Sequence, residues 1–302
     1  MNGHEPLIVQ FGSGLSRRGF MKSAAAAAAS VAVERSVVHG AEAEPKALID
    51  TNVSLGHWPF RYAKPGNTPG LVGELRKQGA TQAWASSLDA LLHKDIASVN
   101  VRLAEECKQH GADFLIPIGA VNPKLPDWEE DLRRCDEEHR MPGIRLYPNY
   151  HGYKLNDPAF ERLLHLANAR NMLVQIAVIM EDERTIHPLV NVPPTDTTPL
   201  NTTLKKFPKV RLQLLNAFRT LDGTDADSLS SLGVYFEIAM LEGLRGVEKL
   251  LKQIPLSSIC FGSYFPVFYF DSARLKLQES ELAGAPMKAI CSENALRLLS
   301  KT

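Results

Sequence analysis

Titratable side chains follow several short apolar stretches of the sequence, where an enzyme could place its chemistry. Glu237 and His151 could act as general bases, because carboxylates and imidazoles can be tuned to exchange protons near neutral pH. Arg145 could hold a substrate carboxylate through two parallel hydrogen bonds. These three are the catalytic candidates. The plainer interpretations are satisfied polar residues for Glu237 and His151, and an ion pair with Glu237 or Asp50 for Arg145.

Five further residues are candidates for substrate binding. Asn52 and Asn216 carry amides, which do not titrate, so we expect them to orient a ligand or each other rather than transfer protons. Tyr147 and Tyr264 belong to a group of aromatic residues that could stack on a substrate or simply pack under loops. His57 follows the first apolar stretch, and its plainer interpretation is a loop histidine bonded to the backbone or to solvent.

Eight short, β-branched apolar stretches could position these residues, and segments of helical periodicity separate them. Strands that alternate with helices run parallel. Eight such units in about 260 residues predict an α/β fold, a closed (β/α)8 TIM barrel with its site at the carboxyl ends of the strands. No glycine-rich phosphate loop follows the first stretch, which disfavours a dinucleotide-binding fold. The predicted strands cover residues 47–53, 81–85, 114–121, 143–147, 172–179, 210–215, 234–238 and 258–261.

The helical segments between these stretches have recognisable ends and faces. Asn156 or Asp157 can cap a helix that Pro158 begins, with Phe160 and Leu163 on its apolar face. Further helices are predicted over residues 91–109, 127–139, 246–252 and 287–299.

The first 43 residues differ in composition from the rest of the chain. Arg17 and Arg18 precede Phe20, six alanines at 24–29, and a small-residue cleavage pattern at 41–43. This string is typical of a twin-arginine export signal. The sequence therefore predicts a signal at 1–43, a barrel domain at 44–302, recognition by the twin-arginine export machinery and a periplasmic or otherwise exported location. The alternative is a disordered or helical alanine-rich tail.

Composition excludes several classes of function. Lys plus Arg and Asp plus Glu both number 34 among 302 residues, so the net charge is zero and gives no sign of a nucleic-acid surface. No stretch of the mature part approaches ~18 uninterrupted apolar residues, so no transmembrane segment is predicted. The four cysteines form no C-x-x-C pair and do not indicate a zinc or redox site.

Several stretches together resemble the amidohydrolase-related family of TIM-barrel hydrolases and decarboxylases. Leu48-Ile49-Asp50-Thr51-Asn52-Val53-Ser54-Leu55 is similar to its opening strand, and Gly143-Ile144-Arg145-Leu146-Tyr147-Pro148 to its fourth. Phe261-Gly262-Ser263 is similar to its eighth strand, and Glu293-Asn294-Ala295 to its last helix. The resemblance spans the mature chain and implies the same barrel.

The chain departs from this family at the metal ligands. The family usually binds a divalent metal, often zinc, through a His-x-His pair on strand one, a His on strand five or six and an Asp on strand eight. The corresponding residues here are Asn52, Ser54, Ala177, Asn216 and Tyr264. Neutral amide and hydroxyl groups are poor ligands for such an ion. We therefore expect no cofactor and a degenerate metal site.

A relocated metal site is the alternative to this expectation. Three histidines and three acids follow strands one, four and five, although their spacing matches no known signature: His57, His151, His187, Glu181, Asp182 and Glu183.

Two functions remain open at this stage. The resemblance implies a hydrolase or decarboxylase that acts on a small organic molecule. The missing ligands favour a non-catalytic barrel that binds a small molecule without a metal. The fold alone does not decide between them, because function resides in the site.

Overall fold

The computed structural model describes residues 47–58, 60, 62–182, 184, 186, 189–190 and 192–300. The chain separates into two units, residues 1–44 and residues 45–302. The predicted export signal at 1–43 lies outside the described residues. Within them, no helix has the length and apolar character needed to cross a bilayer.

The strands form a closed parallel barrel. Two parallel sheets, β1 to β3 and β4 to β9, contain them, and every neighbouring pair is consecutive along the chain. The strands are β1 (Ile49–Leu55), β2 (Gln82–Ser87), β3 (Leu115–Pro117), β4 (Gly119–Ala120), β5 (Gly143–Leu146), β6 (Leu173–Ala177), β7 (Leu212–Leu215), β8 (Val234–Glu237) and β9 (Ile259–Cys260).

Two joints close the ring. β3 and β4 are two parts of one predicted strand, and Ile118 between them donates its N–H to the carbonyl of Ala85 on β2 at 2.8 Å. At the other joint, Thr51 of β1 donates to the carbonyl of Phe261 at 3.0 Å, and Val53 pairs with Phe265. All eight predicted strands are present, and the (β/α)8 prediction is confirmed.

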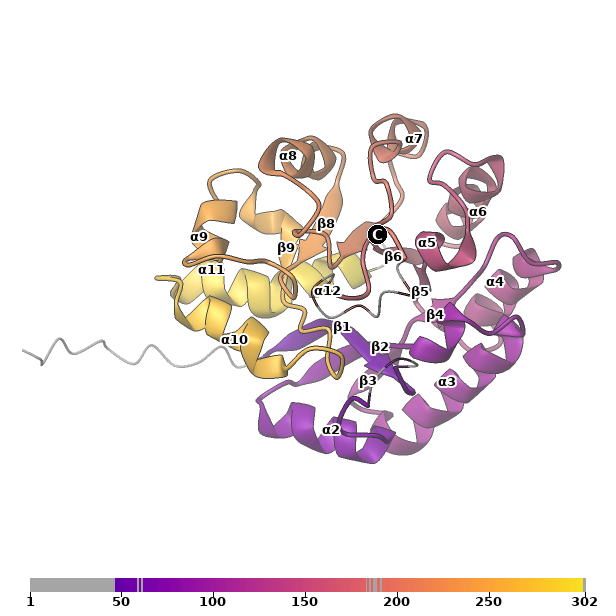
Figure 1. Ribbon diagram of the computed structural model, residues 1–302, viewed down its shortest axis with the longest axis horizontal. Helices are drawn as coiled ribbons and strands as arrows, with labels where there is room; N and C mark the ends of the chain where they lie inside the picture. Colours follow the sequence, from indigo (N-terminus) through magenta and orange to yellow (C-terminus); the bar gives the residue numbers. More distant parts are fainter. Residues whose placement is uncertain are drawn as a thin grey trace, which may run out of the picture. The chain divides into compact units, whose positions relative to one another are not determined.

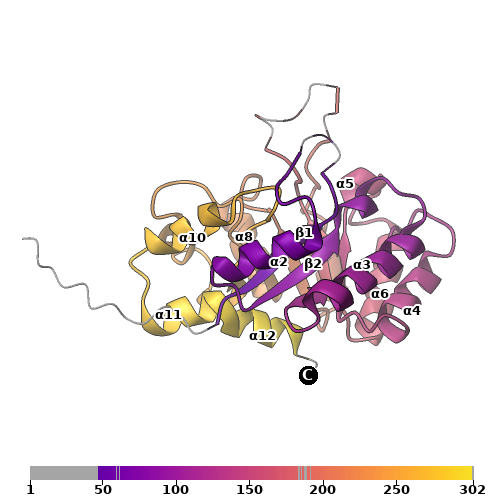
Figure 2. The same cartoon turned by 90° about the horizontal axis from the view of Figure 1, so that it is seen from below.

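Helices surround the strands (Figure 1). They are α2 (Thr68–Lys77), α3 (Ile96–Gly111), α4 (Trp128–Glu137), α5 (Pro148–His151), α6 (Pro158–Ala169), α7 (Leu200–Lys206), α8 (Gly223–Ser231), α9 (Gly246–Leu250), α10 (Phe270–Gln278), α11 (Gly284–Lys288) and α12 (Asn294–Leu299). Shorter helical turns cover Leu88–Leu91, Leu256–Ser258 and Ala289–Glu293. Figure 2 shows α12 at the end of the unit opposite the loops that follow β1. There Ala295 and Leu298 pack against Ile49 and Leu173.

Some predicted helix boundaries were wrong. The helix expected from Leu91 begins at Ile96, because Asp95 caps it by accepting a hydrogen bond from the Ser98 N–H at 3.0 Å. Asp157 precedes α6 as predicted, but its carboxylate accepts from the Lys154 N–H at 3.2 Å instead of capping the helix. The final predicted helix is divided by a wider π-type turn at Ala289–Glu293.

A polar layer crosses the barrel interior below the strand ends. Gln175 on β6 donates to the side chain of Gln213 on β7 at 2.8 Å and to the carbonyl of Thr51 at 2.9 Å. Gln213 donates to the Thr51 hydroxyl at 2.9 Å, and Arg145 donates to Gln175 at 2.9 Å. All four side chains are buried, so each hydrogen bond replaces one lost to water.

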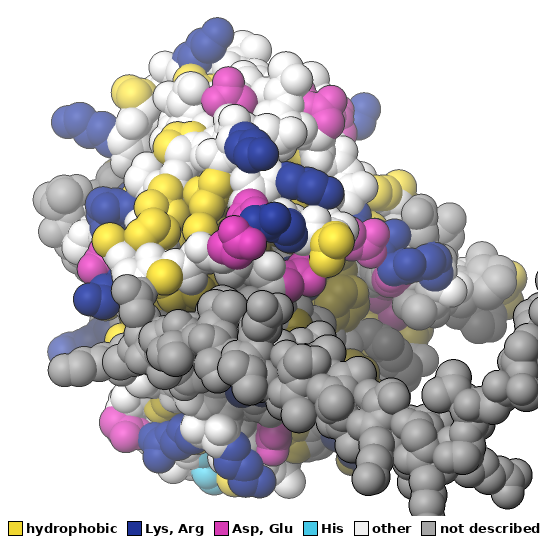
Figure 3. Space-filling model, turned by 90° about the vertical axis from the view of Figure 1, so that its left-hand side faces the viewer, with side chains coloured by type: hydrophobic (Ala, Val, Ile, Leu, Met, Phe, Trp, Pro, Cys, Tyr) yellow, Lys and Arg dark blue, Asp and Glu magenta, His cyan; other side chains and the backbone are white. Residues whose placement is uncertain are grey.

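One face of the surface and the four cysteines complete the description of the fold. The face seen in Figure 3 mixes basic, acidic and apolar side chains, so it shows no field of a single sign. The four cysteines are buried and unbridged. Burial raises the pKa of the Cys107, Cys135 and Cys291 thiols to about 12, which keeps these thiols protonated.

Candidate functional site

Three polar side chains, from β1, from β8 and from the residue after β7, meet near the carboxyl end of the barrel. Asn52 of β1 donates its amide N–H groups to the Asn216 side-chain oxygen at 2.9 Å and to Glu237 Oε1 at 3.2 Å. Each of the three residues is 1% exposed. We call Asn52, Asn216 and Glu237 the mouth triad. The sequence placed all three among the candidates, and the fold brings them into direct contact.

Backbone groups hold the Glu237 carboxylate at the end of β8. Its Oε1 accepts from the Asn216 N–H at 2.6 Å, and its Oε2 accepts from the Ala239 N–H at 2.5 Å. Gly262, two residues after β9, must lack a side chain, since a Cβ there would lie 2.7 Å from Oε2. In the sequence Gly262 was only part of a family resemblance. Its close approach to Glu237 becomes evident only in the fold.

A second buried carboxylate lies beside the mouth triad. Asp50 accepts hydrogen bonds from the backbone N–H groups of Asn52 at 3.1 Å and Ser263 at 3.0 Å, and from the Ser263 hydroxyl. Sequence reasoning considered Asp50 only as an ion-pair partner of Arg145. Its contact with Ser263 depends on closure of β9 onto β1, which no local sequence signal reports.

Burial raises the pKa values of both carboxyl groups. Removal from water brings the pKa of Glu237 to about 7 and that of Asp50 to about 6, although several hydrogen bonds oppose this change. The negative charge of Asp50 raises the pKa of Glu237 further. Glu237 therefore exchanges its proton near neutral pH, as general acid–base catalysis requires.

One atom of the mouth triad has no partner among the described residues. Asn52 Oδ1 is buried and accepts no hydrogen bond there. The orientation of the amide is fixed, because turning it over would set this oxygen against the acceptors on Asn216 and Glu237. A ligand that carries an O–H or N–H group would satisfy it.

Two site residues have left-handed backbones. Asn216 has φ 56° and Tyr264 has φ 57°. This conformation is tolerated by asparagine but is unusual for a bulky aromatic residue, and such strain concentrates at functional sites. The Tyr264 hydroxyl donates to the Met180 carbonyl at 2.8 Å, which contributes to holding the ring at the mouth.

Aromatic residues pack around Tyr264. Trp58, Tyr147 and Tyr264 are buried in one apolar cluster with Met180. Trp58 Nε1 donates to Glu181 Oε1 at 2.7 Å, and the Tyr147 hydroxyl donates to Ser86 at 3.4 Å. These buried rings therefore pack under loops and do not form an open surface on which a substrate could stack.

His151 and Arg145 lie in other environments. His151 Nε2 is 2.9 Å from the Ala90 carbonyl, its Nδ1 has no partner among the described residues, and burial lowers its pKa. Arg145 belongs to the polar layer and also donates to the Val53 carbonyl at 3.0 Å. Within the described part of the chain it forms no direct ion pair with Asp50 or Glu237, whose charges act on it only through space.

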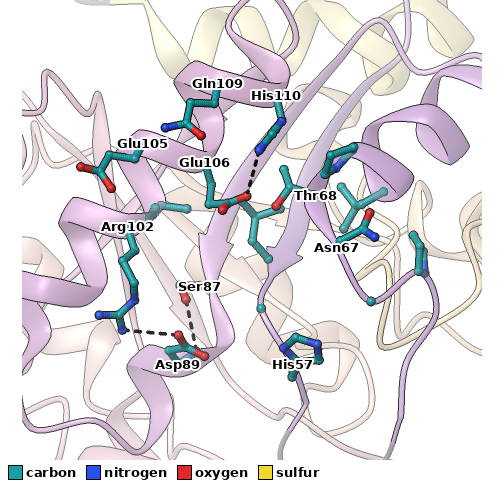
Figure 4. A pocket seen from close by; sticks show the side chains of 17 residues that line it. His57, Asn67, Thr68, Ser87, Asp89, Arg102, Glu105, Glu106, Gln109 and His110 are labelled. Carbon is teal, nitrogen blue, oxygen red and sulfur yellow. Dashed lines mark hydrogen bonds and ion pairs between the residues drawn. The ribbon is translucent and has the colours of Figure 1, made fainter.

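His57 lines a separate pocket of about 510 Å³ between the loop after β1 and α3 (Figure 4). The His57 side chain is exposed there. In the same pocket, Glu106 lies 3.8 Å from His110, and Asp89 lies 3.5 Å from Arg102. None of the mouth triad lines this pocket. His187, which the relocated metal site would need, lies outside the described residues.

The raised pKa values predict a pH dependence of stability. The folded protein holds protons on Asp50 and Glu237 that the unfolded chain releases near pH 4, so the free energy of unfolding should fall as the pH rises from about 4 to about 7, by about 1 to 3 kcal/mol for each group. Urea unfolding at pH 5 and pH 8 measures this. The lowered pKa of His151 makes the free energy of unfolding rise with pH, which partly offsets this fall. The same measurement on Glu237→Gln isolates the contribution of Glu237, and the fall should be shallower in that variant. An equal fall in both proteins would contradict the prediction.

The sequence matches the family model described as Amidohydrolase over residues 57–301. The chain belongs to the amidohydrolase family. No curated protein sequence matches it.

Solved structures with the same fold include three decarboxylases. The 2,6-dihydroxybenzoate decarboxylase of Rhizobium is 14% identical with a TM-score of 0.63, and the match covers 85% of this chain and 99% of the decarboxylase chain. The 5-carboxyvanillate decarboxylase of Novosphingobium aromaticivorans, complexed with manganese, is 13% identical with a TM-score of 0.66 over 86% and 97%. The dihydroxybenzoic acid decarboxylase of Polaromonas, with bound manganese, is 13% identical with a TM-score of 0.62 over 84% and 96%.

These structures contradict the expectation that no cofactor is involved. Two of them contain manganese, so a metal ion is normal in this fold family. Manganese prefers carboxylate, carbonyl and water ligands. Among the described residues of this chain, no three His, Cys, Asp or Glu side chains converge to hold an ion, and the oxygens of Asp50 and Glu237 already accept hydrogen bonds. These residues do not fit the ion, and no step proposed for this chain passes through a metal.

Proposed function

We propose that this protein decarboxylates a small hydroxylated aromatic acid, and that Glu237 supplies the proton. The observation that carries the proposal is the mouth triad, where a buried carboxyl group with a pKa of about 7 lies beside an amide oxygen that has no partner in the described part of the chain. The solved structures of the same fold support the substrate class, because their names give dihydroxybenzoate and carboxyvanillate.

The proposed reaction uses the Glu237 carboxyl group and the Asn52 amide oxygen. The bond between the ring carbon and the carboxylate breaks, carbon dioxide leaves, and the ring carbon takes the proton of the Glu237 carboxyl group. Glu237 is left as a carboxylate and regains its proton from water. A phenolic O–H of the substrate would donate to Asn52 Oδ1 and fix the ring against Glu237. Glu237 is 1% exposed, so the substrate must displace part of the aromatic packing around Tyr264.

A substrate panel tests this function. The purified protein is incubated with 2,6-dihydroxybenzoate and 5-carboxyvanillate, in buffer with and without manganese, and released carbon dioxide and the decarboxylated phenol are quantified. Equimolar formation of both products supports decarboxylation. Binding of the acids without turnover would overturn the proposal in favour of a non-catalytic barrel. Hydrolysis of amide or ester analogues alone would favour a hydrolase.

We also propose that the chain is exported through the twin-arginine route. The support is the sequence at 16–43, with Arg17 and Arg18 ahead of the alanine-rich segment. Replacing both arginines with lysine is expected to retain the full-length protein in the cytoplasm. Cell fractionation and the mass of the mature N-terminus, expected near Glu44, measure the outcome. Unchanged delivery of the double variant would contradict this proposal.

A further inference from the structure

A cavity of about 630 Å³ lies outside the mouth triad, between the loops after β7 and β8 and helix α10. It is large enough for a small organic molecule. None of the mouth triad lines it, although Ala239, whose N–H binds Glu237, does. The cavity is therefore a neighbour of the site described above and has its own lining.

Lys276 of α10 is the distinctive charge in this cavity. Its ammonium donates one hydrogen bond, to the Ala239 carbonyl at 2.8 Å, and has two further N–H groups. It forms no ion pair with any described carboxylate, and Glu237, Glu242 and Glu279 act on it only through space. Partial burial lowers the pKa of Lys276. An anion brought to this ammonium would gain a charge-assisted hydrogen bond.

The other charges around the cavity compensate one another. Arg219 contacts Asp182 at 2.9 Å and Glu242 at 2.7 Å, and Arg184 contacts the same two carboxylates at 2.5 and 3.1 Å. Two cations and two anions are thereby held in one network. Glu279 remains as an exposed acid just after the end of α10. Lys276 is consequently the cation best placed to attract a ligand.

The remaining wall is apolar. Met240 is buried, Phe268 is half-buried, and Leu275 and Leu244 are 57% and 73% exposed. An apolar ring or chain laid along this wall would cover Leu244 and Leu275 and remove their surface from water. The lining thus combines one cation with an apolar face.

We propose that this cavity binds a small organic monocarboxylate, with its carboxylate on Lys276 and its apolar body against Phe268 and Leu275. The site is distinct from the mouth triad and does not depend on the proposed decarboxylation, because binding here requires no turnover. A single ammonium suits a monoanion better than a phosphate dianion, which would call for more donors.

Binding of benzoate, measured by ligand-observed NMR titration, tests the site. Lys276→Met is expected to weaken benzoate binding at least tenfold, whereas Lys276→Arg keeps it within a few fold. The matched control is Lys288→Met, which removes an exposed lysine on α11 and should leave binding unchanged. Benzamide, which has the same shape without the charge, should bind the wild type at least tenfold more weakly than benzoate. Inorganic phosphate should not displace benzoate.

A second variant keeps the test decisive if Lys276→Met fails to fold. Ser272→Asp places a carboxylate one helical turn before Lys276 and should weaken benzoate binding several-fold through the new ion pair. Equal binding of benzoate to the wild type and either variant would overturn the proposal. So would equal binding of benzamide, or displacement by phosphate. Loss of benzoate binding in Glu237→Gln would also overturn it, by placing the ligand in the barrel mouth.

Discussion

Glu237→Gln is expected to lower the decarboxylation rate at saturating substrate by about 100-fold or more, because the amide cannot deliver a proton. Glutamine preserves the volume, and its one oxygen can still accept a hydrogen bond from either the Asn216 N–H or the Ala239 N–H, which the carboxylate binds through different oxygens. The Michaelis constant should change much less than the rate, since the lost interaction belongs to the chemical step.

The pH profile provides an independent check on this role. The acid form of Glu237 is the proton donor, and its pKa is about 7, so wild-type activity should fall as the pH rises through about 7. Rates across pH 5 to 9 for the wild type, Glu237→Gln and the exposed control Glu293→Gln measure both effects. A Glu237→Gln enzyme that retains more than a third of the wild-type rate would rule out the proton transfer.

Arg145→Met is expected to lower the free energy of unfolding by about 2 to 4 kcal/mol. The guanidinium is 1% exposed and donates to Gln175 and to the Val53 carbonyl inside the polar layer. Methionine has comparable length but offers no donors, so Gln175 would keep a buried oxygen without its partner. The buried acids Asp50 and Glu237 would also lose the through-space attraction of this charge.

Urea unfolding of matched variants measures this loss. Arg162→Met removes a surface arginine that pairs with Glu129 at 3.1 Å, and its cost should stay below about 1 kcal/mol because both side chains are about half exposed. Arg145→Lys should fall between the two, since it keeps the charge but not the planar set of donors. A cost for Arg145→Met no larger than that for Arg162→Met would show that the polar layer contributes little to stability.

The strands were predictable from the sequence because buried parallel strands consist of short runs of apolar residues. Residues 114–121 were recognised as one strand although Ile118 divides it in two. The start of α3 was missed because Leu88–Leu91 is apolar as well, and only the cap formed by Asp95 shows where the helix begins. Local periodicity does not distinguish a separate helical turn from the first turn of a longer helix.

The candidate site was predictable in part, for a geometric reason. Asn52 lies within β1, Glu237 ends β8 and Asn216 directly follows β7. Alignment of the strands in one parallel barrel is enough to bring these three residues together. His57 lies beyond the end of its strand, and the loop carries it to a different pocket. The partnership of Asp50 with Ser263 arises from residues more than 200 positions apart, and only closure of the barrel creates it.

The four buried cysteines allow local opening of the barrel to be measured by chemical modification. Cys107 lies on α3, Cys135 on α4, Cys260 on β9 and Cys291 in the turn before α12. A buried, protonated thiol reacts with iodoacetamide only after the structure around it opens. The order in which the four thiols become alkylated in native buffer would therefore rank the free energies of local opening at α3, at α4, at β9 and at the turn before α12. No engineered probe is needed.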